Sequence, residues 1–171
     1  FFHADISHLL LNVLGIFIFG KIVERKLGAK KTAVIYFLAL IASNIFSSLI
    51  HIFALKDNIP GLGASGALMG LVAVAILIDP FYITHMLVIP LPVMAVGWLT
   101  LYADIAGILN PVEDGIGHFA HLGGFLSIAI FSFFYSGIEK GKARKGLVVN
   151  IVSLAVIALS FYIINSMINS L

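Results

Sequence analysis

Long apolar runs recur along the whole chain and are separated only by short polar interruptions. A membrane-spanning helix needs about 20 consecutive, mostly apolar residues. The chain is 61% hydrophobic and only 11% charged, whereas soluble domains have about 45–50% apolar and about 25% charged residues. So few charges cannot cover the surface of a water-soluble monomer. We therefore expect a protein solvated by lipid, without a separate soluble domain.

The polar interruptions leave room for about six spans. An open sheet in lipid leaves backbone groups unpaired, and the alternation typical of a barrel is absent from the sequence. We therefore predict an all-α, polytopic transmembrane helical bundle with spans near residues 6–22, 32–55, 64–79, 91–109, 117–136 and 147–168. Prolines punctuate residues 80–90, which we expect to form an interfacial connection.

Positive charge marks the cytoplasmic side of short loops in membrane proteins. Nine of the ten basic residues fall in two clusters, one after the first span and one after the fifth: Lys21, Arg25, Lys26, Lys30 and Lys31, then Lys140, Lys142, Arg144 and Lys145. This distribution places loops 1, 3 and 5 in the cytoplasm and the other loops outside.

Three segments that concentrate polar or small residues lie at outward helix ends by this topology. In the first segment His8 and Asn12 are four residues apart, so both project from one helix face. The second holds Ser65 between glycines at the start of the third span, where backbone amides are free. The third contains His121 among small residues.

Small residues predict how two of these segments meet. Gly66 and Gly70 form one pair four residues apart, and Ala120 and Gly124 form another. Such pairs allow membrane helices to approach closely. Contact between them would bring the histidine beside the serine.

Ser65 and His121 are the minimum pair for nucleophilic catalysis, because a serine hydroxyl needs a base and histidine suits that task near neutral pH. No acid accompanies His121 in its own segment, so a dyad is more economical than a Ser-His-Asp triad. We expect His8, Asn12 and the Ser65 backbone amide to stabilise the oxyanion of a tetrahedral intermediate.

These segments resemble the rhomboid family of intramembrane serine proteases. The resemblance covers residues 1–136 and rests on four motifs: His3-Ala4 with His8-x3-Asn12, Gly20 through Glu24 to Gly28, Gly63-Ala64-Ser65-Gly66, and Ala120-His121-Leu122-Gly123-Gly124. It implies that Ser65 is the nucleophile, that His121 is the general base, and that His8 and Asn12 contribute to the oxyanion site. It also implies that the site is supported by Gly63, Gly66, Gly70, Met69, Ala120 and Gly124.

The resemblance further implies a catalytic core at residues 1–136 without the family's first helix, a basic cytoplasmic loop at 137–146 and an additional C-terminal transmembrane helix at 147–171. Many members place an aromatic at the position of Met69, where it packs on the catalytic histidine. The implied substrates are transmembrane-anchored proteins, cleaved through an acyl-enzyme near the outer membrane face. The implied location is the plasma (cell inner) membrane, with the site opening to the extracytoplasmic side.

Two other classes of function compete with this hypothesis. A catalytically silent relative would use the same fold to bind client helices. A small transporter or channel would use Ser65, His121 and Asp104 as a polar pathway, but it leaves the glycine-rich motifs without a reason. The sequence indicates no oligomeric state.

The remaining ionisable residues suggest no cofactor. His118 and His121 have a spacing that would suit a metal only with a third ligand, so we predict no metal site and place His118 at the water interface. Asp104 is the one acid well inside an apolar run, and we expect it to face outer water or to pair with a neighbour. A net charge of +2 gives no reason to expect nucleic acid as a partner.

Overall fold

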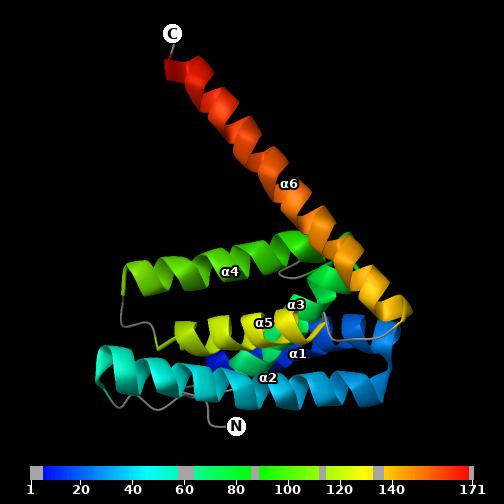
Figure 1. The fold of residues 1–171 in the computed structure, drawn as a ribbon, viewed down its shortest axis with the longest axis vertical. Coiled ribbons are helices and arrows are strands. Elements are labelled where there is room, and N and C mark those ends of the chain that lie inside the picture. Colours follow the sequence, from blue (N-terminus) through cyan, green and yellow to red (C-terminus); the bar gives the residue numbers. More distant parts are fainter. Residues whose placement is uncertain (1–5, 58–63, 86–88, 112–114, 133–136, 170–171) are drawn as a thin grey trace.

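The computed structural model describes residues 6–57, 64–85, 89–111, 115–132 and 137–169 (Figure 1). Within these ranges the chain forms six α-helices, a π-helical turn that continues α2, and two short antiparallel strands. The elements are α1 (Ile6–Leu27), α2 (Ala29–Leu49), η1 (Ile50–Leu55), α3 (Ser65–Ile78), β1 (Ile83–Thr84), β2 (Leu91–Pro92), α4 (Val93–Leu109), α5 (His118–Ser132) and α6 (Ile138–Asn169).

The predicted all-α membrane bundle is confirmed, but its helices differ in length. Among the described residues, three segments are long and apolar enough to cross a membrane: Ile6–Leu27, Ala29–Leu55 and Glu139–Ile168. The apolar helices α3 and α4 are shorter. With 14 residues, α3 is about 21 Å long at about 1.5 Å per residue, which is less than the hydrocarbon thickness of about 30 Å. Helix α3 is therefore too short to cross that layer by itself.

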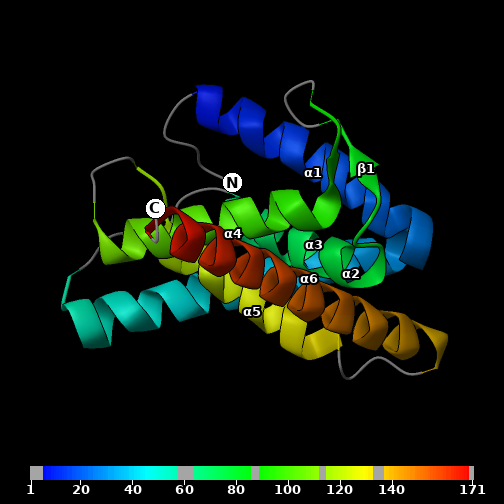
Figure 2. The ribbon, with the colours of Figure 1, turned by 90° about the horizontal axis from the view of Figure 1, so that it is seen from above.

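Helix α3 is the centre of the bundle and lies between α1 and α5 (Figure 2). Twelve of its 14 residues are buried, as expected for a helix that is apolar on every side. The most enclosed side chains of the core include Leu71, Val72 and Val74 of α3, with Phe19 of α1 and Ile35 of α2.

Glycines bring α3 into backbone contact with α5. A Cβ atom at Gly124 of α5 would overlap the carbonyl oxygen of Gly66 in α3. A Cβ atom at Gly70 would lie 3.1 Å from Ile128 Cγ1 and would overlap Ala39 of α2. The two small-residue pairs therefore meet, as their spacing predicts, and α2 packs against the same face of α3.

Residues 137–146, expected as a basic loop, instead begin a helix. Helix α6 is continuous from Ile138 to Asn169, and Figure 1 shows its C-terminal part projecting away from the other helices. The segment rich in Lys, Arg and Glu has strong helix formers, and its Ala143 is buried in the core. Gly146 lies against the carbonyl of Leu77, at the end of α3, where a Cβ atom would not fit.

One buried asparagine fixes α6 to two other helices. Asn150 Nδ2 donates to the carbonyl of Ile76 at 2.8 Å and to that of Gly146 at 2.8 Å, while its Oδ1 accepts from Trp98 Nε1 at 2.8 Å. Its amide group is thus satisfied on both sides, which offsets the cost of burying it.

Two ion pairs join the helix ends on the basic side of the bundle. Lys26 Nζ lies 2.7 Å from Asp79 Oδ2, and Lys31 Nζ lies 2.5 Å from Glu139 Oε1. These pairs are partly exposed, so each contributes at most about 1 kcal/mol. The connection at residues 80–90 is not helical where described, and it carries β1, which pairs with β2.

Replacing Gly124 with alanine should destabilise the protein, because the new methyl group overlaps the Gly66 carbonyl. We expect a loss of about 1–3 kcal/mol, measured by thermal unfolding in detergent. Gly141→Ala is the matched control, since a Cβ atom at this helical glycine meets nothing within 4 Å. The control should be neutral or stabilising by about 0.5–1 kcal/mol. Equal stabilities for the two variants would contradict the proposed role of the backbone contact.

Candidate active site

Ser65 is the first residue of α3 and is 7% exposed. The preceding residue, Ala64, has no side chain that can cap the helix, and no side-chain cap is present. The first backbone amides of an α-helix have no acceptor within the helix. The hydroxyl of Ser65 is therefore accompanied by amide donors at the positive end of a helix dipole.

His121 lies in the turn of α5 that packs against the start of α3. The Ala120 carbonyl oxygen would be 3.2 Å from a Cβ atom at Gly66, so the residues next to Ser65 and His121 in the sequence face each other. Further along, Gly70 lies near Ile128, so the two helices run in the same direction. Their starts therefore lie at the same end of the bundle.

Helix α1 brings Asn12 to the same level. Leu68 of α3 packs on Gly15 of α1, and Leu71 packs near Gly20, so these two helices are also parallel. Asn12 precedes Gly15 by three residues in α1, and Ser65 precedes Leu68 by three residues in α3. Both therefore lie about 4.5 Å along their helix axes from the same contact, at a rise of about 1.5 Å per residue. His8 lies one further turn towards the start of α1 and is half-buried.

The side-chain amide nitrogen of Asn12 is unusual because it is buried and has no hydrogen-bond partner among the described residues. Asn12 is 4% exposed, and its Nδ2 has no hydrogen-bond acceptor among the described residues. A buried donor without an acceptor costs about 1–3 kcal/mol, and such groups often mark functional positions. The amide can donate to a group that enters the site.

Asp104 supplies the acid that the His121 segment lacks. This residue of α4 is 4% exposed, and its Oδ1 lies 2.8 Å from His121 Nδ1 and 2.9 Å from His118 Nδ1. The expectation that no acid accompanies His121 holds only for its own segment, since α4 and α5 pack side by side. His118, expected at the water interface, has a side chain that is only 13% exposed. The pattern that could have found Asp104 is its position as a lone acid in an apolar run.

The remaining predicted residues are only partly described by the structure. Met69 lies one turn after Ser65 and is 4% exposed in the core. Gly63 and His3 lie outside the described residues. Among the residues that the structure describes, no group of three or more His, Cys, Asp or Glu side chains could hold a metal ion.

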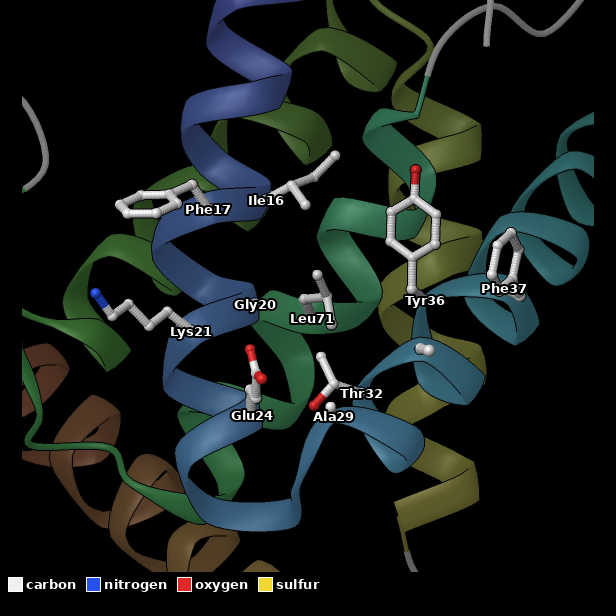
Figure 3. A pocket seen from close by; sticks show the side chains of 11 residues that line it. Ile16, Phe17, Gly20, Lys21, Glu24, Ala29, Thr32, Tyr36, Phe37 and Leu71 are labelled. Carbon is white, nitrogen blue, oxygen red and sulfur yellow. The ribbon is translucent and has the colours of Figure 1, made fainter.

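One sizeable cavity lies away from this site. A groove of about 520 Å³ lies between α1 and α2, with Leu71 of α3 at its base (Figure 3). It begins at Ile16 and reaches Glu24, towards the basic end of α1. Its lining contains neither Ser65 nor His121, so it does not define the candidate active site.

Comparison with known proteins identifies the family. Residues 1–138 match the Rhomboid domain family. The chain belongs to the rhomboid family. Rhomboid protease AarA of Providencia stuartii is 25% identical over 94% of this chain and 62% of its own length. RHOMBOID-like protein 12, mitochondrial, of Arabidopsis thaliana is 27% identical over 84% of this chain and 46% of its own length.

Rhomboid protein 1, mitochondrial, of Saccharomyces cerevisiae is 30% identical over 85% of this chain and 43% of its own length. The chain thus spans about half the length of the curated rhomboid relatives that it matches. No solved structure matches the chain. Rhomboid membership and the apolar helices establish a membrane protein.

Two buried asparagines should respond to substitution in opposite directions. Asn12→Leu removes an unpartnered buried amide, so we expect it to raise the free energy of unfolding by about 1–3 kcal/mol. Asn150→Leu leaves Trp98 Nε1 without its acceptor and should lower that free energy by a similar amount. Thermal unfolding in detergent measures both effects. A loss of stability in Asn12→Leu equal to that of Asn150→Leu would show that Asn12 serves packing.

Proposed function

We propose that this chain forms the catalytic part of an intramembrane serine endopeptidase. The observation that carries the proposal is that Ser65 starts an uncapped, buried helix beside His121 of α5. Asn12 lies at the same level, and its Nδ2 has no acceptor among the described residues. Membership of the rhomboid family and similarity to a named rhomboid protease support this class of activity.

In the proposed reaction Ser65 Oγ attacks the carbonyl carbon of the scissile peptide bond while His121 takes the hydroxyl proton. The carbonyl oxygen becomes an oxyanion, which the Asn12 amide, His8 and the Ser65 backbone amide stabilise. The C–N bond then breaks, and His121 gives its proton to the leaving amine. Water, deprotonated by His121, hydrolyses the acyl-enzyme and restores Ser65.

The short α3 favours substrates that are themselves anchored in the membrane. Asp79, just after the end of α3, pairs with Lys26 of the basic cluster, which we place at the cytoplasmic surface. Because α3 is shorter than the hydrocarbon layer, Ser65 then lies below the outer surface. Irregular backbone at that depth is tolerated where it lines a water-filled cavity. We infer cleavage of transmembrane-anchored proteins near the extracytoplasmic face, in the plasma (cell inner) membrane.

A silent client-binding protein is the second candidate. It is favoured by the absence of a hydrogen bond between Ser65 and His121 among the described residues. Catalytic hydrogen bonds are often long in the absence of substrate and tighten when it binds, so this geometry is compatible with both candidates.

Labelling by a fluorophosphonate probe distinguishes the candidates. The full natural chain in detergent should react at Ser65, and Ser65→Ala and His121→Ala should each reduce labelling at least about a thousandfold. The same variants should lose cleavage of a reconstituted transmembrane substrate.

Matched controls are Ser153→Ala, on α6, and His85→Ala, in the exposed connection after β1. Both should react like the wild type. Full labelling of Ser65→Ala would contradict the assignment of the nucleophile, and an unreactive wild type would favour the client-binding protein.

A further inference from the structure

Asp104 occupies a position where an unpaired carboxylate is costly. It lies within α4, is 4% exposed, and belongs to an apolar run. Burying an ionised carboxylate costs several kcal/mol unless hydrogen bonds and opposite charge compensate. Two imidazole groups of α5 supply those hydrogen bonds, at 2.8 Å from His121 and 2.9 Å from His118.

The hydrogen bond determines which nitrogen of His121 can act as a base. An ionised carboxylate can only accept, so the proton of the neutral imidazole lies on Nδ1. Nε2 then carries the lone pair that a general base requires.

His118 restrains the carboxylate from the same helix. It precedes His121 by one turn, and its Nδ1 lies 2.9 Å from the same Oδ1 atom. Its ring lies against Gly107 of α4, where a Cβ atom would overlap the ring. The missing side chain at Gly107 therefore lets His118 lie close to α4, within reach of Asp104.

We propose that Asp104 is a positioning residue for His121, so that the site is a Ser-His-Asp arrangement assembled from α3, α5 and α4. This inference rests on the proposed function of Ser65 and His121. Asp104 does not contact the substrate; it fixes the tautomer and orientation of the base. The opposing interpretation is that the Asp104 contacts only join α4 to α5, as a structural hydrogen bond.

Asp104→Asn tests the proposal because the amide has nearly the same shape but carries no charge and can donate to His121. The second-order rate of fluorophosphonate labelling at Ser65 should fall by about a hundredfold to ten-thousandfold. Asp57→Asn is the matched control, since Asp57 Oδ1 also accepts from a histidine, lying 2.6 Å from His51 Nδ1. It should label at the wild-type rate.

A second measurement does not depend on catalysis. In wild-type protein with 15N-labelled histidine, at about pH 8, above the usual histidine pKa, NMR should show His121 protonated at Nδ1 and bare at Nε2. His121→Ala assigns the signal. In Asp104→Asn the Nε2-protonated form should appear. A merely structural contact would lower the unfolding temperature of Asp104→Asn and leave its labelling rate at Ser65 unchanged.

The outcomes separate the two proposals. If the wild type is labelled and the labelling rate of Asp104→Asn is within threefold of the wild-type rate, the role of Asp104 is overturned. The protease assignment then stands. A wild-type His121 protonated at Nε2 would also overturn the role of Asp104. An unlabelled wild type, under conditions where a known serine hydrolase reacts, would overturn both proposals.

Discussion

The close approach of α3 and α5 through glycine determines where every group of the candidate site lies. At Gly124 a Cβ atom would overlap the carbonyl oxygen of Gly66, and at Gly66 a Cβ atom would lie 3.2 Å from the carbonyl oxygen of Ala120. Lipid gives helices no hydrophobic reason to associate, so contact depends on van der Waals packing that small residues permit. This contact sets His121 beside the start of α3, and α1 and α4 are then arranged around the same helix.

Two buried asparagines near opposite ends of α3 differ in whether their side-chain amides have partners among the described residues. Asn150 has partners for both its amide nitrogen and its oxygen, and it joins α6 to α3 and α4. The Asn12 amide nitrogen, at the other end of α3, has no acceptor among the described residues. A folded protein rarely retains such a cost where only packing is needed. The difference supports a structural role for one asparagine and a chemical role for the other.

The apolar segments predicted most of the fold, because length and hydropathy decide which stretches can cross lipid. They did not predict that α6 begins at Ile138. Charged residues made the segment resemble a loop, yet Lys, Arg and Glu are good helix formers, and Ala143 and Gly146 pack against the core. Motif spacing predicted Ser65, His121 and the glycine pairs as neighbours, whereas nothing local to His121 indicated Asp104, 17 residues away.

The sequence by itself determined that the chain is a helical membrane protein, which end of the bundle is basic, and which serine and histidine are candidates for chemistry. These properties depend on composition, periodicity and short motifs, which are local. The tertiary structure decided the environment of those residues: the amide of Asn12 without an acceptor, and the carboxylate of Asp104 shared by His118 and His121. A hydrogen bond between helices depends on their relative rotation and height, and those are set by packing of the whole bundle.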